Sequence, residues 1–200
     1  MTYPGLPAPR ITDHLSREAS MASYAPGTTF QIAKIEMVAN TGTYVDAPSH
    51  RWEDGHDLST LPLDAVANLD GLVIDHKSSR AFSASEVGEV RGRAVLIRTG
   101  WSRHFATAEY GSGQHPFVTR EAAEALVAGG AKLVGIDSLN IDDTADKSRP
   151  AHTILLRAGI PIVEHLTALE MLPRDGFRFF AVPARFVGVG TFPVRAFAIV

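Results

Sequence analysis

The polar residues best suited to chemistry lie between positions 40 and 50, where the chain reads Asn-Thr-Gly-Thr-Tyr-Val-Asp-Ala-Pro-Ser-His. Asn40, Tyr44, Asp46 and His50 are separated by even numbers of residues. On an extended chain they would share one face, because strand side chains alternate. An imidazole near a carboxylate supplies a base near neutral pH and an anionic partner or metal ligand. The segment therefore predicts an acid–base or metal site, and the alternative is a loop in which Asp46 only closes a turn.

A second polar pair, His152 and Glu164, occurs much later in the chain. Glu164 ends the apolar run Ile160-Pro-Ile-Val163, which predicts a strand, and strand ends are common places for site residues in open sheets. His152 lies in Pro150-Ala-His-Thr-Ile-Leu-Leu156. These residues are candidates for a site, and the alternative is an ordinary loop histidine and a solvated strand end.

Trp101 follows another predicted strand, within Arg98-Thr-Gly-Trp101. An aromatic ring at the carboxyl end of a strand provides a wall on which a flat substrate stacks. The alternative is a tryptophan that covers the core. The sequence leaves both interpretations open.

Short apolar runs closed by turn or polar residues dominate the rest of the chain and predict strands. They occupy residues 72–75, 94–98, 132–136, 160–163, 177–182 and 194–200, with a longer, imperfectly alternating run over 30–39. The sheet that positions the polar clusters is therefore expected to contain most of the ordered residues.

Helices are fewer. The clearest covers residues 120–128, since Thr119 suits an N-cap and Gly129-Gly130 stops the helix. A capping-box pattern at 83–86 predicts a shorter helix, and residues 14–21 a third. Strands interleaved with helices predict an α/β (α+β) fold with a mixed sheet, a single domain over 1–200, and a loose, proline-rich N-terminal arm over 1–10.

The composition excludes several classes of site. The 200 residues include eight His and no Cys, so thiol nucleophiles, cysteine-ligated metals and disulfides are ruled out. A net charge of −3 gives no basic surface for nucleic acid. No apolar stretch approaches the ~20 residues that span a bilayer, and the first ten residues lack a secretory signal. We therefore expect a cytoplasmic protein with no nucleic acid or membrane partner.

The segment 40–50 resembles the motif His-x-Gly-Thr-His-x-Asp-x-Pro-x-His of the cyclase family, which includes bacterial kynurenine formamidase (arylformamidase) and isatin hydrolase. The resemblance extends to His152 with Glu164 twelve residues on, and to further segments in the same order, namely 61–63, 95–101, 133–137 and 193–199. It covers nearly the whole chain.

This resemblance implies a swivelling-type β/β/α domain, a homodimer or higher homo-oligomer, and hydrolysis of an amide or cyclic amide by water on a divalent metal, zinc or manganese. Carried over position by position, it implies that Asp46, His152 and Glu164 are metal ligands. It implies that His50 carries the proton.

Asn40 and Tyr44 stand where the family has two ligand histidines. An Asn carbonyl is a weak ligand, and a tyrosine must lose a proton of pKa ~10 before it binds a cation well. These replacements put the metal in question. Asn40 and Trp101 are the candidates for contact with a small aromatic substrate.

Three hypotheses remain. In the first, one divalent metal sits on a remodelled site and the protein cleaves a C–N bond. In the second, there is no metal, and His50 as base and Tyr44 as acid or oxyanion donor catalyse a cyclisation, dehydration or tautomerisation. In the third, the protein is a non-catalytic binding module.

Overall fold

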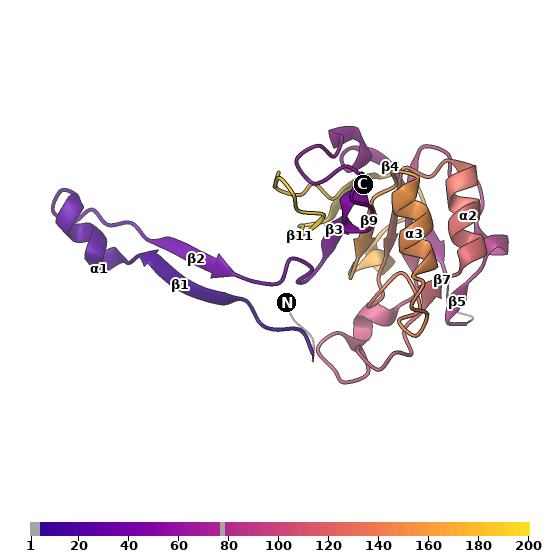
Figure 1. Ribbon diagram of the computed structural model, residues 1–200, viewed down its shortest axis with the longest axis horizontal. Coiled ribbons are helices and arrows are strands. Elements are labelled where there is room, and N and C mark those ends of the chain that lie inside the picture. Colours follow the sequence, from indigo (N-terminus) through magenta and orange to yellow (C-terminus); the bar gives the residue numbers. More distant parts are fainter. Residues whose placement is uncertain (1–4, 77–78) are drawn as a thin grey trace.

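An eight-stranded mixed sheet forms the centre of the protein, in the order β11-β3-β9-β8-β6-β4-β10-β12 (Figure 1). The computed structural model describes residues 5–76 and 79–200. The four central strands are parallel, and each outer strand is antiparallel to its neighbours. The strands are β3 (Tyr44–Asp46), β4 (Leu69–Asp75), β6 (Arg93–Arg98), β8 (Leu133–Ile136), β9 (Ile162–Glu164), β10 (Arg178–Phe180), β11 (Thr191–Pro193) and β12 (Phe197–Ile199). The predicted α/β class with a mixed sheet is confirmed.

The sheet is buried on both faces, which explains why its central strands read as continuous apolar runs. In β6, Val95 and Ile97 face one core, and Ala94 and Leu96 contribute to the other. The first core also contains residues of both longer helices. Six strands of the sheet coincide with predicted runs, although their ends are shifted: β4, β6, β8, β9, β10 and β12.

Two helices, α2 (Arg120–Gly129) and α3 (Pro150–Arg157), lie side by side over one face of the sheet (Figure 1). The predicted caps of α2 are correct, because the Thr119 hydroxyl accepts from the Ala122 amide at 3.2 Å and Gly130 is left-handed at φ 78°. Helix α3 was not expected. It begins at Pro150, a residue well suited to the first turn of a helix.

Shorter elements connect these layers. The capping box at 83–86 is present, but it opens only a single 3₁₀ turn. The 3₁₀ helices are η1 (Met21–Ser23), η2 (Pro48–His50), η3 (Leu63–Ala65), η4 (Ala84–Glu86), η5 (Trp101–His104) and η6 (Leu169–Met171), and β5 (Ala81–Phe82) pairs with β7 (Phe117–Val118). In the described ranges, no helix is long and apolar enough to cross a membrane.

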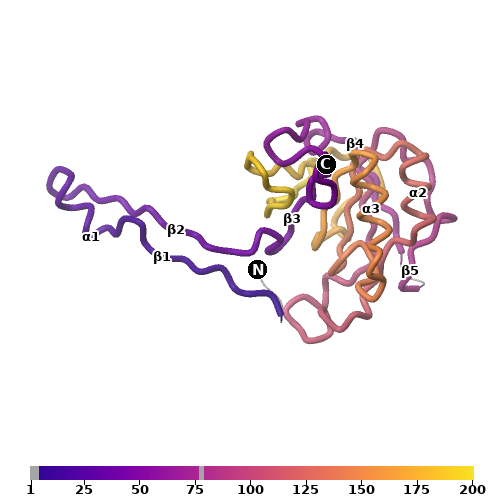
Figure 2. Tube along the Cα trace, in the orientation of Figure 1, coloured from indigo at the N-terminus to yellow at the C-terminus, as the bar shows by residue number. Residues whose placement is uncertain are grey.

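A hairpin of β1 (Arg10–Leu15) and β2 (Ile32–Glu36), closed by the four-residue helix α1 (Arg17–Ser20), projects far from the sheet (Figures 1 and 2). The predicted helix over 14–21 is therefore wrong in extent, because its first residues pair in β1. The predicted strand over 30–39 is shorter and belongs to this hairpin. Of the loose arm expected over 1–10, residues 1–4 lie outside the described residues and Arg10 already begins β1.

Candidate active site

Strand β3 places Tyr44 and Asp46 on one face of the sheet, as alternation requires. The extended segment is much shorter than the spacing suggested. Gly42 is left-handed at φ 73°, so the chain turns before β3. After β3 ends at Asp46, the 3₁₀ helix η2 begins at Pro48. The expected single face over 40–50 is therefore wrong, and His50 reaches the site from a 3₁₀ turn.

Strand β9 places Glu164 directly opposite Tyr44. The Tyr44 hydroxyl donates to Oε2 of Glu164, and the Ile141 amide donates to Oε1 at 2.5 Å. Asn140 Nδ2 lies 3.5 Å from Oε2. Complete burial disfavours the charged carboxylate and raises the pKa of Glu164 to about 7. Glu164 is thus a buried, hydrogen-bonded carboxyl group and not a solvated strand end.

Helix α3 positions His152 through its first turn. Asp142 accepts the amides of Ala151 at 2.6 Å and His152 at 3.2 Å, and its Oδ2 lies 2.6 Å from His152 Nδ1. This contact leaves Nε2 directed at the sheet, 3.5 Å from Asp46 Oδ2 and 3.8 Å from Glu164 Oε1. Burial opposes the charged imidazole, but the carboxylates of Asp142 and Asp46 outweigh it and raise the pKa of His152 to about 10.

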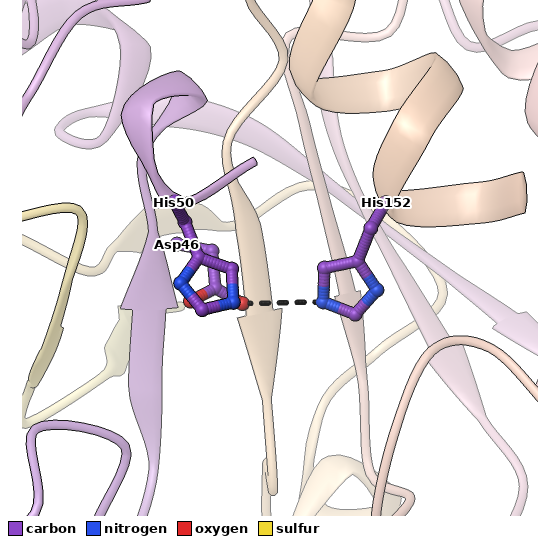
Figure 3. Close-up of side chains that lie close together, drawn as sticks. All are labelled: Asp46, His50 and His152. Carbon is purple, nitrogen blue, oxygen red and sulfur yellow. Dashed lines mark ion pairs between the residues drawn. The ribbon is translucent and has the colours of Figure 1, made fainter. Parts of the chain in front are cut away.

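Asp46 is completely buried, and neither of its carboxylate oxygens accepts a hydrogen bond from the described part of the chain. Its neighbours are imidazole nitrogens, since His50 Nδ1 lies 3.9 Å from Oδ1 and His152 Nε2 lies 3.5 Å from Oδ2. Figure 3 shows the His50 ring drawn over Asp46 and the His152 ring facing Asp46 from the side of helix α3.

The three residues fit a divalent cation. One ligand atom from each of Asp46, His50 and His152 lies within 4.8 Å of the others. Buried carboxylates are normally hydrogen-bonded, and a carboxylate with two imidazoles but no hydrogen bonds has the composition of a ligand set. Nitrogen and oxygen donors of this kind suit zinc or manganese. Of the predicted ligands, Asp46 and His152 are in this cluster and Glu164 lies beside it.

Trp101 and Asn40 are placed differently. Trp101 is buried, its Nε1 donates to the Tyr110 carbonyl at 3.2 Å, and its ring lies 4.7 Å from that of His104. Asn40 is half-buried in the turn before Gly42. Contact of either residue with substrate stays a prediction.

Three residues that the sequence did not single out support the site. Asp142 orients His152, while His165 and Tyr110 form a buried pair with Nδ1 2.7 Å from the hydroxyl. Burial lowers the pKa of His165 to about 4, so this imidazole is neutral. Asp142 precedes helix α3 by eight residues, too far for a capping signal to be recognised.

Comparison with known proteins identifies a family to which the chain is similar. The family model described as Putative cyclase matches residues 6–143. Kynurenine formamidase of Salinibacter ruber (strain DSM 13855 / M31) is 28% identical over 172 residues, which cover 84% of this chain and 80% of that protein.

Two solved structures are similar. Isatin hydrolase A from Labrenzia aggregata, bound to benzyl benzoate, superposes with a TM-score of 0.80 at 23% identity, over 98% of this chain and 84% of that one. A potential metal-dependent hydrolase with cyclase activity gives a TM-score of 0.73 at 27% identity, over 94% and 96% of the two chains. The first of these shows a common fold.

Proposed function

Because the chain belongs to the Cyclase family, we propose that it is a hydrolase that cleaves the C–N bond of an amide or cyclic amide in a small aromatic compound. The observation that carries the proposal is the buried Asp46 carboxylate, which faces two imidazoles without a hydrogen bond. The names of the relatives, a formamidase and an isatin hydrolase, support a hydrolytic reaction.

His50 is the proton carrier in this proposal. Its side chain is 39% exposed, whereas that of Asp46 is 0% exposed and that of His152 is 9% exposed, so substrate and water reach His50 most easily. The imidazole accepts a proton as water adds to the carbonyl carbon, and it donates that proton to the nitrogen as the C–N bond breaks. Oδ1 of Asp46 lies 3.9 Å from Nδ1 of this imidazole.

Asp46, His152 and Glu164 would hold the cation in this proposal. His50, whose nitrogen lies in the same cluster, is the more exposed imidazole and is assigned the proton transfer. When bound, a zinc or manganese ion supplies Lewis acidity, which makes water a stronger acid and polarises a carbonyl group. Asp142 fixes the orientation of His152, and such outer partners orient metal ligands in proteins. Glu164 Oε1 keeps a lone pair for a cation although it accepts the Ile141 amide, whereas Oε2 accepts from both Tyr44 and Asn140.

The metal-free cyclase, dehydratase or tautomerase is the second candidate, because His50 beside Asp46 needs no metal to act as a base. It also needs the Tyr44 hydroxyl as acid or oxyanion donor. That hydroxyl is buried and donates to Glu164, so it would have to leave this partner to reach a substrate. This geometry favours the first candidate over the second.

Elemental analysis of protein purified without added metal, combined with turnover of formanilides and lactams, tests the proposal. We expect about one equivalent of zinc or manganese and a turnover that chelation abolishes. His50→Ala should lose turnover and keep the metal, whereas His56→Ala, at an exposed histidine whose ring contacts Thr60, should change neither.

Other outcomes would overturn the proposal. Turnover without metal would establish the metal-free alternative. No turnover of any amide, lactam or lactone would favour the binding module. Loss of the metal in His50→Ala would make His50 a ligand and remove it from the role of proton carrier.

We also propose that the hairpin arm packs against a second copy of the chain. Ile11 and Ile35 are partners in the β1–β2 ladder, so they share a face, and they are 67% and 60% exposed. An isolated two-stranded hairpin is only marginally stable in water. The arm extends away from its own sheet (Figure 2), and a two-fold pair of copies would cover its apolar face.

Analytical ultracentrifugation tests this second proposal. We expect a dimer for the natural sequence and a monomer for the double variant Ile11→Lys/Ile35→Lys. Thr12→Glu, opposite Lys34 on the other face of the hairpin, should remain dimeric. A monomeric natural protein, or a dimer that survives the double lysine change, would contradict the proposal.

A further inference from the structure

A cavity of about 520 Å³ lies where β3, β9 and β11 meet at one end of the sheet. Its lining is mostly apolar and includes Gly42, Phe105, His165, Pro193, Val194 and Arg195. A cavity of this size matches a small molecule, and such sites are largely apolar with a few placed polar groups.

The cavity lies next to the candidate active site, although the residues that would hold the cation do not line it. Gly42 and Thr43 in its wall lead directly into Tyr44, and His165 follows Glu164. The His165 ring lies 5.3 Å from that of Tyr44. A molecule in the cavity therefore lies beside the Tyr44–Glu164 pair, and Glu164 Oε1 is 3.8 Å from His152 Nε2.

Its aromatic wall is held in place. The His165 carbonyl accepts from the Thr43 hydroxyl at 2.7 Å, and its amide donates to the Ser138 carbonyl at 3.2 Å. These bonds keep His165 in a left-handed conformation at φ 56°, which is rare for a residue with a side chain. Tyr110 fixes the ring through Nδ1. A fixed imidazole ring and Phe105 in the same cavity wall favour a flat ligand.

Arg195 is the charged residue among those that line the cavity. It is exposed, and no carboxylate within the described ranges lies at ion-pair distance from it. A guanidinium binds a carboxylate through two parallel hydrogen bonds, and such a pair fixes orientation as well as adding affinity. An arginine without an ion-pair partner, at the edge of an apolar cavity, is therefore suited to an anionic substituent on a flat molecule.

We propose that this cavity binds the aromatic ring of the substrate and that Arg195 binds a carboxylate carried by that ring, so that the protein selects anionic aromatic amides over neutral ones. The inference rests on the proposed function and narrows its substrate class. Arg195 acts as a specificity residue, and the reacting bond lies toward Tyr44 and Glu164.

Binding of unreactive probes tests the inference without turnover. Isothermal titration should show that benzoate binds and that benzamide, its neutral analogue, binds far more weakly. Arg195→Gln should weaken benzoate binding roughly 10- to 100-fold, as expected for the loss of charge-assisted hydrogen bonds, and leave benzamide unchanged. Arg91→Gln, at an exposed arginine beside Gly130, is the control.

A cavity-filling variant provides the second arm. Thr167 is exposed and lines the cavity, so Thr167→Trp should exclude both probes with little effect on folding. Equal binding of benzoate and benzamide, or benzoate binding unchanged in Arg195→Gln, would overturn the inference.

Turnover separates this inference from the proposed function. For N-formylanthranilate, Arg195→Gln should raise KM and leave kcat nearly unchanged, while formanilide kinetics stay constant. Arginine-dependent benzoate binding in a protein that hydrolyses no amide would uphold the cavity and refute the hydrolase.

Discussion

The hydroxyl of Tyr44 donates to the carboxylate of Glu164 across the antiparallel pair of β3 and β9. Tyr44, for which the resemblance to the family motif predicts a histidine position, thus interacts with a carboxyl group. This contact links the two polar segments of the sequence, and the first predictions depend on it.

Removing the hydroxyl should destabilise the protein. Tyr44→Phe leaves Oε2 of the buried Glu164 with only the 3.5 Å contact of Asn140, and an unsatisfied buried acceptor costs ~1–3 kcal/mol. Urea denaturation measures the change, with Tyr24→Phe in the exposed hairpin arm as control. Equal stability of the two variants would contradict the prediction. A turnover loss above 100-fold would assign Tyr44 to the acid role of the metal-free alternative.

Restoring the two histidines should add a metal site. In Asn40→His/Tyr44→His, imidazoles replace a weak neutral ligand and a protonated phenol, so we expect the bound zinc or manganese to rise by about one equivalent. Elemental analysis before and after the change gives the answer. An unchanged metal content would mean that the family motif is misaligned on residues 40–50.

Asp142 should control metal affinity without touching the metal. Asp142→Asn weakens the contact that orients His152, and loss of such partners typically reduces metal affinity ~10- to 100-fold. Competition with a chelator measures the affinity. The neighbouring Asp143→Asn removes an ion pair with Arg80 and should leave it unchanged. Similar metal affinities for the two variants would show that His152 keeps its orientation without Asp142.

Acid should remove the stabilising effect of Asp57. The Gly188 amide and the Ser59 hydroxyl hold the pKa of Asp57 well below its usual 3.8. A lowered pKa in the folded state stabilises it at pH values above 3.8, and the effect is lost as the pH falls toward the folded pKa. The natural protein should therefore be more stable than Asp57→Asn at pH 6, and the difference should shrink below pH 3.8. A difference that is independent of pH would refute this account.

The sequence predicted the parts of the fold that depend on local pattern. The central strands and α2 carry periodicity and caps that are visible in a few residues, and their positions were correct within a few residues. Helix α3 was missed because its first turn is capped by Asp142, which is distant in sequence. The hairpin arm was missed because the residues between β1 and β2 are mostly polar and small. Their pattern predicted a helix over 14–21 and gave no sign that the flanking segments pair as strands.

The site was predicted in composition more than in geometry. Spacing alone suggested one extended face, whereas the chain turns at Gly42 and again after Asp46, so that His50 approaches from a 3₁₀ turn. The bond between Tyr44 and Glu164 and the two open oxygens of Asp46 depend on strand pairing, which no local pattern specifies.

Tyr44 and Glu164 are 120 positions apart in the chain. Closing a loop of this length costs conformational entropy, and the contact offsets this cost only once it has formed. We therefore expect β3 to join β9 after the parallel strands between them in the sequence have formed. A folding intermediate that contains the central sheet without β3 would hold Glu164 but lack Asp46 and His50 together, so the complete site would form only when β3 joins. Recovery of metal binding during refolding would accordingly follow the last step of sheet assembly.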